Sequence, residues 1–370
     1  MSKTNKVPLF HIVRRKELPW WRAWLVRVIA VVLALALCGI ISWLLVKENP
    51  LNIYGAMIEG TFGTERRLWT TGRDLAVLLG IALALAPAFK MRFWNLGGDG
   101  QTLMGTLGAT APMILLAGKV PDGLLVLIML VCAILFGAIW GFIPAVFKAR
   151  FNTNETLFTL MMNYVAIQIV AFFVVTWENP KGASKIGIIN PDSHAGWLPS
   201  LGGQQYLIMI IIVAILTVAM FIYMKYTKHG YEISVVGESE PTARYVGIKV
   251  PRVIIRTMIL SGAICGLVGF LLVSGSDHTM TTTLVGGRGF TAVMVAWLAK
   301  FNPFFMILTS FLLVFLDRGA SEISSMFQLN DSFGAILTGI ILFFIIGCEF
   351  FLNYQIVFRK SAKKEVSLNV

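Results

Sequence analysis

Two short blocks of this chain combine glycines with a polar or ionisable side chain and lead directly into apolar runs. The first block reads GGDGQT at positions 97–102, and the second reads GGRGFT at positions 286–291. Glycine releases the backbone from helical dihedral angles. A helix that begins after such a break presents unpaired N–H groups and a positive dipole end, which suit the oxygens of a polar solute. The blocks therefore predict solute binding, and their six glycines are Gly97, Gly98, Gly100, Gly286, Gly287 and Gly289.

Residues suited to covalent or metal chemistry are scattered along the chain. The cysteines and histidines are Cys38, Cys132, Cys265, Cys348, His11, His194, His229 and His278. Each cysteine lies in a separate apolar run, and neither residue type shows the spacing of a metal site. The chain also has no Walker A pattern, so ATP would be bound by another chain if ATP drives this protein. We therefore expect no catalytic site, no metal and no cofactor.

The composition places the chain in a membrane. Hydrophobic residues make up 57% of the sequence, charged residues make up 14%, and the mean hydropathy is +0.77. This leaves too little polar surface to cover a water-soluble body of 370 residues. The net charge of +12 is not interpreted as a nucleic-acid footprint, because the basic residues lie in short loops between apolar runs. The predicted class is an all-α polytopic membrane protein.

Apolar segments of about 20 residues are long enough to cross a hydrocarbon layer of ~30 Å. We place about ten such segments, at residues 27–46, 72–89, 93–117, 123–147, 156–177, 204–224, 253–274, 287–299, 303–327 and 333–353. The first lacks a small-residue cleavage site behind it and is interpreted as an uncleaved span. The chain then divides into a basic leader (1–26), a transmembrane domain (27–353) and a basic tail (354–370). Most of the 31 Lys and Arg residues fall on the side of both termini, which predicts cytoplasmic termini.

The two glycine blocks fall in the third and eighth segments, which divides the ten segments into five plus five. Glycine-broken segments at corresponding places in two halves are typical of inverted repeats around a translocation path. In the first copy, residues 93–100 are expected to be extended, and a helix to run over 101–117. In the second copy, residues 276–289 are expected to be non-helical, and a half-length helix to follow at 290–299. The alternative is a chance match, because 34 of the 370 residues are glycine.

Polar side chains inside the spans should face the protein interior or a water-filled path. The candidate path residues are Asn95, Asp99, Gln101, Asn163, Tyr164, Gln168 and Phe290. On the fifth segment, Asn163, Tyr164 and Gln168 are interpreted as one helical face. Two alternatives stay open: Asp99 caps its helix or pairs with a basic loop residue, and the polar residues of the fifth segment form interhelical hydrogen bonds.

The longest loop on the predicted cytoplasmic side covers residues 226–252. A short helix is expected to begin at Pro241, which favours the first helical turn, and to end near Gly247, which suits a C-cap. This helix is a candidate docking element for a cytoplasmic partner, and a solvated loop helix without a partner is the alternative. The docking residues are Gly237, Glu238, Pro241, Arg244, Tyr245 and Gly247.

Five motifs together resemble one known family. They are FWNLGGDGQ at 93–101, NET at 154–156 with MNY at 162–164, the loop at 237–247, SGA at 261–263 with GLVG at 266–269, and GRGF at 287–290. They are similar to the permease subunits of bacterial ABC importers for simple sugars and nucleosides, which are grouped with the branched-chain amino-acid permeases. The first two motifs look most like the nucleoside-type branch.

The resemblance implies a permease that moves a nucleoside or a related sugar-bearing solute across the bacterial inner membrane. It implies two ATP-binding cassette ATPase subunits, a second permease subunit in a homodimer or heterodimer, and an extracytoplasmic substrate-binding protein. It also implies that the loop at 237–247 carries the coupling helix that sits in a groove of the ATPase. The alternatives are an ABC permease for a simple sugar or a flavin, or an ion-coupled secondary transporter that uses Asp99, Arg288 or Glu349.

Overall fold

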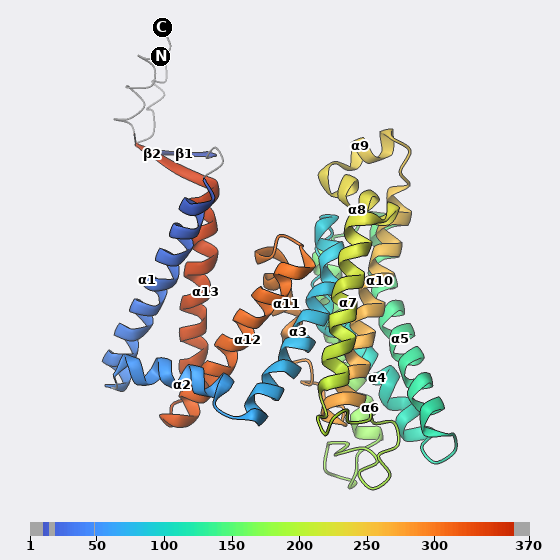
Figure 1. Ribbon diagram of the computed structural model, residues 1–370. Helices are drawn as coiled ribbons and strands as arrows, with labels where there is room; N and C mark the ends of the chain where they lie inside the picture. Colours follow the sequence, from blue (N-terminus) through green and yellow to red (C-terminus); the bar gives the residue numbers. More distant parts are fainter. Residues whose placement is uncertain (1–9, 15–18, 48, 359–370) are drawn as a thin grey trace. The chain divides into compact units, whose positions relative to one another are not determined.

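The computed structural model describes residues 10–14, 19–47 and 49–358 (Figure 1). These residues belong to two compact units, one formed by Met1–Gly63 with Leu316–Val370 and one formed by Thr64–Phe315. We call them unit 1 and unit 2. The boundary falls inside the helix α12, Pro303–Met326. Residues 1–9 and 15–18 of the leader and residues 359–370 of the tail lie outside the described residues.

Unit 1 is built on a pair of helices and a small ribbon that the sequence did not predict. Its elements are β1 (Phe10–Arg14), α1 (Trp20–Val46), α2 (Pro50–Phe62), the C-terminal part of α12, α13 (Asp331–Asn353) and β2 (Tyr354–Phe358). The helices α1 and α13 pack together, and β1 pairs antiparallel with β2. The described parts of the leader and the tail therefore lie side by side, and the expectation of a wholly helical chain needs this correction.

The helix α2 was also missed, although its start has a recognisable signature. The side chain of Asn49 accepts a hydrogen bond from the Leu51 N–H at 3.0 Å, and Pro50 occupies the first turn. Gly60 lies against α12, where an added Cβ would be 3.2 Å from the Arg318 carbonyl oxygen. The Asn-Pro pair predicts a helix start, but α2 has only 13 residues and is too short to be found by a search for membrane spans.

Unit 2 is a helical bundle that holds every candidate path and docking residue. Its elements are α3 (Glu65–Lys90), α4 (Gly98–Leu115), α5 (Asp122–Phe151), α6 (Glu155–Thr176), α7 (Leu207–Tyr226), α8 (Lys228–Glu238), α9 (Glu240–Tyr245), α10 (Val250–Leu272), the π-helix η1 (Val273–Asp277), α11 (Arg288–Leu298) and the first part of α12. The apolar stretches of α3 and α10 are largely buried, whereas those of α5, α6 and α7 are largely exposed. The helices α8 and α9 lie at one end of this bundle, and residues 177–206 lie at the opposite end (Figure 1).

A helix is present at each of the ten places where a membrane segment was predicted. In the described part of the chain, seven helices are long and apolar enough to cross a membrane: α3, α5, α6, α7, α10 with η1, α12 and α13. Within α1, the described residues Val28–Leu44 form a further apolar helix, and α11 is a short apolar helix of 11 residues. The chain is therefore a multi-pass membrane protein, whereas ten crossings and an inverted repeat stay predictions.

Glycines bring the backbones of α5 and α10 into direct contact. An added Cβ at Gly262 of α10 would overlap the Gly137 carbonyl oxygen of α5. One at Gly266 would overlap the Ala133 carbonyl oxygen, also of α5. In the opposite direction, an added Cβ at Gly137 would lie 2.8 Å from the Gly266 Cα. Small residues four apart allow membrane helices to approach closely, since there is no side chain between them. We call these contacts the glycine seam.

Candidate functional site

The two glycine blocks of the sequence meet in the interior of unit 2. The helix α4 begins at Gly98 and α11 begins at Arg288, and the Gly289 N–H donates a hydrogen bond to Asp99 Oδ1 at 2.9 Å. An added Cβ at Gly289 would lie 2.6 Å from the Asp99 nitrogen, so the two helix starts touch through glycine. Two positive dipole ends thus converge on one carboxylate. Asp99 caps the partner helix α11, which neither of the sequence-based alternatives included.

The non-helical stretch before α4 is shorter than expected, because the helix begins at Gly98 instead of Gln101. Asn95, which is fully buried, stabilises this earlier start. Its Oδ1 accepts from the Gly97 N–H at 3.0 Å and from Gln101 Nε2 at 3.3 Å, and its Nδ2 donates to Ser261 Oγ at 3.1 Å. The Gln101 side chain is 1% exposed. The polar atoms of both predicted path residues are therefore bound to other groups of the protein.

Asn163 of α6 holds the same break from the other side. Its Oδ1 accepts from the Gly100 N–H at 2.9 Å, and its Nδ2 donates to the Leu96 carbonyl oxygen at 2.8 Å. One turn earlier, Thr159 Oγ1 accepts from the Leu96 N–H at 3.2 Å. An asparagine side chain supplies both a donor and an acceptor, so it replaces the backbone partners that the break leaves unpaired.

Tyr164 and Gln168 do not share the face of Asn163. Asn163 is buried, whereas Gln168 is exposed and Tyr164 is 60% exposed on the outer side of α6. Neighbouring residues of a helix point about 100° apart, so the interpretation of one common face was wrong. The second block likewise leaves the Phe290 ring 46% exposed.

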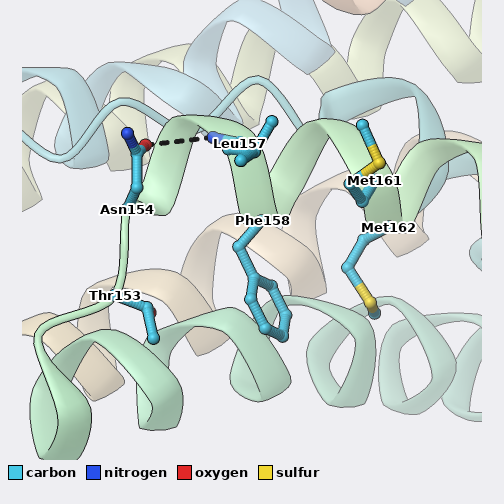
Figure 2. Close-up of a pocket in the computed structure, with 6 residues that line it drawn as sticks. All are labelled: Thr153, Asn154, Leu157, Phe158, Met161 and Met162. Atoms are coloured by element: carbon cyan, nitrogen blue, oxygen red, sulfur yellow. Dashed lines mark hydrogen bonds between the residues drawn. The ribbon is translucent and has the colours of Figure 1, made fainter.

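The outer side of α6 carries two shallow grooves along its length. The first lies at the start of the helix and is lined by Thr153, Asn154, Leu157, Phe158, Met161 and Met162 (Figure 2). Asn154 begins the helix, because its side chain accepts from the Leu157 N–H at 3.1 Å. The second groove is lined by Tyr164, Val165, Gln168, Ile169, Phe172 and Phe173. Apart from Asn154, Thr153, Tyr164 and Gln168, both grooves are apolar.

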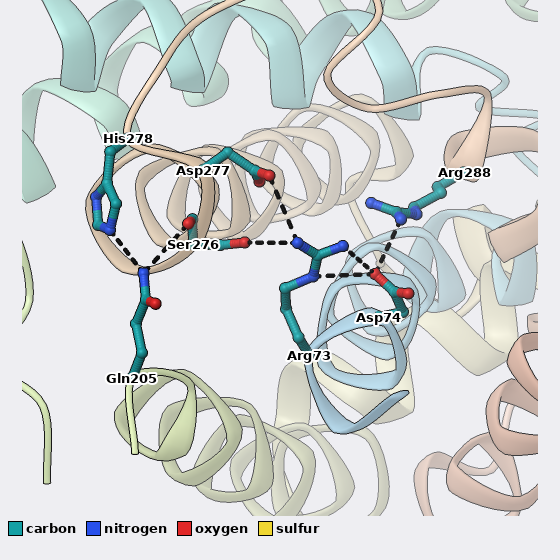
Figure 3. Close-up of polar contacts among 7 residues, drawn as sticks. All are labelled: Arg73, Asp74, Gln205, Ser276, Asp277, His278 and Arg288. Atoms are coloured by element: carbon teal, nitrogen blue, oxygen red, sulfur yellow. Dashed lines mark hydrogen bonds and ion pairs between the residues drawn. The ribbon is translucent and has the colours of Figure 1, made fainter. Parts of the chain in front are cut away.

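Sequence reasoning missed an ion-pair network that joins α3, η1 and α11 (Figure 3). Asp74 Oδ1 accepts from Arg73 Nη2 and from Arg288 Nη2, each at 3.0 Å. Arg73 Nη1 also lies 3.5 Å from Asp277 Oδ1 and 3.4 Å from Ser276 Oγ. Arg288 therefore pairs with α3 and not with Asp99. The available signal was an adjacent Arg and Asp in the first half of a predicted span, where charges need partners.

A histidine continues this network toward residues 177–206. Gln205 Nε2 lies 2.8 Å from His278 Nε2, and the His278 ring stacks on Trp197 at a centroid distance of 3.6 Å and an interplanar angle of 3°. Burial lowers the pKa of the His278 imidazole below its ordinary value. The ring is therefore neutral at neutral pH and its Nε2 accepts from the Gln205 amide.

At the other end of the bundle, the predicted docking loop is two helices seated on an apolar core. Ile233 and Val236 of α8 and Ala243 of α9 are buried among the ends of α3, α5 and α10. Gly237 is buried, and the space where a Cβ would stand is filled by the Lys90 carbonyl oxygen. The expected short helix is present as α9, with Pro241 in its first turn. Ala243 anchors α9 to this core, and the alternative of a solvated loop helix without a partner stays open.

The outer surface of α9 carries most of the other predicted docking residues. The exposed ones are Glu238, Pro241, Arg244, Tyr245 and Gly247. Tyr245 is 93% exposed, and the Arg244 side chain forms an ion pair with Glu240 of the same helix at 3.4 Å. Tyrosine and arginine are enriched among the residues that dominate protein–protein contacts, so this surface is a candidate docking site.

The bundle, with its helix breaks held by buried hydrogen bonds, defines a polytopic membrane protein. A family model described as branched-chain amino acid transport system / permease component matches residues 72–346. The chain belongs to this family: it is the membrane component of a transporter and is not itself catalytic.

Three curated relatives align over most of the chain. It is 29% identical to the guanosine ABC transporter permease protein NupP of Bacillus subtilis, over 87% of this chain and 92% of the relative. It is 27% identical to the nucleoside ABC transporter permease protein NupB of Lactococcus lactis, over 92% of this chain and 94% of the relative. It is 25% identical to the glucose ABC transporter permease protein TsgB13 of Haloferax volcanii, over 92% of each chain.

Proposed function

We propose that this chain is the permease subunit of an ATP-driven importer that moves a nucleoside or a related sugar-bearing solute into the cell. The observation that carries this proposal is the anchored helix α9, whose Tyr245 stands 93% exposed at one end of the bundle. In a chain of this family, such a surface supplies the contact to an ATPase subunit. Two of the three relatives are named for nucleosides, which favours this solute class over a hexose.

The proposal includes the orientation and the partners of the subunit. The α9 end faces the cytoplasm of a bacterial cell together with both termini, since most basic residues fall on that side. Two ATP-binding cassette ATPase subunits bind there, and an extracytoplasmic substrate-binding protein delivers the solute to the opposite end. The leader and tail pairing through β1 and β2 supports a common side for both termini.

The solute test uses the chain together with its ATPase subunits and its substrate-binding protein in lipid vesicles. Labelled guanosine is expected to accumulate with ATP, and labelled glucose at least about tenfold more slowly, because a site built for hydrogen bonds strongly rejects a solute that leaves them unpaired. Omission of the ATPase subunits should abolish uptake. Uptake by this chain alone, driven by an ion gradient, would show a secondary transporter, and equal or faster glucose uptake would replace the solute assignment.

The outer face of α6 is the proposed contact with a second permease subunit, with the solute path between the two. A Gln side chain on an otherwise apolar membrane surface is costly in lipid and is stabilised by hydrogen bonds to another helix or to a polar path. Gln168 and Tyr164 lie on this face, in the middle of the exposed surface of α6. The buried Asn95, Asp99, Gln101 and Asn163 then hold the helix breaks, and Phe290 is proposed beside the path.

The change Gln168→Leu tests this placement. It is expected to lower ATP-driven uptake about fivefold or more, because the second subunit or the solute loses a buried hydrogen bond. The matched control is Ile169→Leu, one residue further in the same groove and similar in volume. Uptake and the dimer fraction in detergent are measured together. If Gln168→Leu transports like the control and dimerises normally, α6 faces lipid and the path lies elsewhere.

A further inference from the structure

The short helix α11 is a unit with a left-handed turn at each end. Before it, Gly286 and Gly287 have φ angles of 62° and 75°, and after it, Lys300 and Phe301 have φ angles of 49° and 60°. Left-handed conformations are uncommon for residues with a Cβ, so the two turns separate α11 sharply from its neighbours. The helix has only 11 residues and is bounded on both sides by short turns, which is where hinge residues of moving elements are found.

Two contacts at adjacent residues fix the start of α11. The Gly289 N–H is bound to Asp99 in the buried interior, and the Arg288 side chain is bound to Asp74 of α3 at 3.0 Å. These contacts differ in their access to solvent. The Arg288 side chain is 28% exposed, so water is able to replace its partner at moderate cost. The Arg288 contact is thus the one that is easier to break.

The partner of Arg288 is shared with a second cation. Asp74 Oδ1 accepts from both Arg73 and Arg288, and Arg73 reaches on to Asp277 at the end of η1 (Figure 3). Asp74 is 7% exposed, whereas Arg73 and Asp277 are 21% and 29% exposed. The Asp74 carboxylate therefore links α3 to α11, and Arg73, which it also binds, links α3 to η1. Short π-helical segments such as η1 are frequently found at functional sites.

We propose that Arg73, Asp74, Asp277 and Arg288 form an ion-pair latch that holds α11 closed against α3 and η1 at the end of the bundle opposite α9. The latch opens when Arg288 exchanges Asp74 for water, and α11 then turns about its two left-handed ends. This proposal rests on the proposed function, in which that end receives the solute. The latch would keep the path closed until the solute is delivered.

Hydrogen–deuterium exchange on the full chain in lipid nanodiscs tests the latch without any transport assay. Arg288→Gln is expected to speed amide exchange in α11 about tenfold, because a charged hydrogen bond that closes the helix start is lost. Exchange in the buried part of α10 should stay as in the unchanged protein. The matched control is Arg256→Gln, which breaks the Arg256–Glu232 pair of the same 3.0 Å length at the other end, and which should leave α11 unaffected.

A second variant keeps the test decisive if Arg288→Gln does not fold. Asp277→Asn removes a partner of Arg73 that is 29% exposed and should speed exchange in α11 about threefold, a smaller effect that fits a partly exposed ion pair. Unchanged exchange in α11 for both variants overturns the latch, as does an equal increase in Arg256→Gln.

In the assembled importer, Arg288→Gln should also raise ATP hydrolysis in the absence of solute. If the chain transports but exchange is unchanged, only the latch fails. If exchange responds but no ATP-driven uptake occurs, only the proposed function fails.

Discussion

The change Gly262→Ala is expected to prevent the assembly of unit 2. The single added Cβ would overlap the Gly137 carbonyl oxygen, and this obstacle is backbone, so no rotamer change can move it away. The helices α5 and α10 would have to separate along the whole glycine seam. Overpacking of a core typically costs 1–3 kcal/mol, and we expect more than ~3 kcal/mol here because backbone has to move. The yield of monodisperse protein after detergent extraction, and its melting temperature, measure the effect.

The control for this experiment lies in the same helix pair. Gly123 of α5 has nothing within 4 Å of an added Cβ, so Gly123→Ala should be neutral or slightly stabilising. A second seam variant, Gly266→Ala, should behave like Gly262→Ala because its Cβ would overlap the Ala133 carbonyl oxygen. Protein of Gly262→Ala that melts within 2 °C or so of the Gly123→Ala control would show that the two helices do not depend on this contact.

The change Gly247→Pro is expected to disconnect ATP hydrolysis from transport while the protein still folds. Gly247 has a φ angle of 86° and donates its N–H to the Arg244 carbonyl oxygen at 3.1 Å. Proline fixes φ near −65° and has no N–H, so the turn after α9 cannot form. An added Cβ meets nothing within 4 Å, which confines the damage to the position of α9 and its exposed Tyr245.

Solute-stimulated ATP hydrolysis by the complete complex measures this effect, and we expect a fall of at least tenfold or so, equivalent to ~1.4 kcal/mol of lost contact energy. The control is Gly247→Asn, because asparagine adopts the left-handed conformation more readily than other residues with a Cβ. It should keep most of the stimulation. If Gly247→Pro stimulates hydrolysis like the control, α9 is not the element that transmits solute binding to the ATPase.

The sequence allowed the helices and the glycine breaks to be located, because both depend on local patterns. Apolar runs set the membrane helices, and Pro241 with Gly247 marked α9 within about a turn. The contact of Asp99 with the Gly289 N–H was not predictable, since it joins residues that only the packing of the bundle brings together. The repeat predicted a shared role for the two glycine blocks, but it did not show that the blocks contact each other in the folded chain.

The placement of the polar residues was predicted less well, for two physical reasons. Asn163 and Tyr164 are neighbours in sequence, and one helical step turns the first inward and the second outward. The network around Arg73 and Asp74 was missed because the partners Asp277 and Arg288 are far away in the sequence, and only the folded bundle brings these residues together. In the first case the apolar pattern located the helix but not its rotation about its axis, and in the second it carried no information about distant partners.

The glycine seam also limits which parts of unit 2 can slide past one another. Where side chains separate two helices, a small shift is absorbed by new rotamers, but α5 and α10 touch backbone to backbone at Gly137 and Gly262. Any translation along their common axis would drive carbonyl oxygens over Cα atoms. The two helices therefore keep a fixed register and behave as one rigid body. Displacements during a transport cycle must then occur in the elements that pack against this pair.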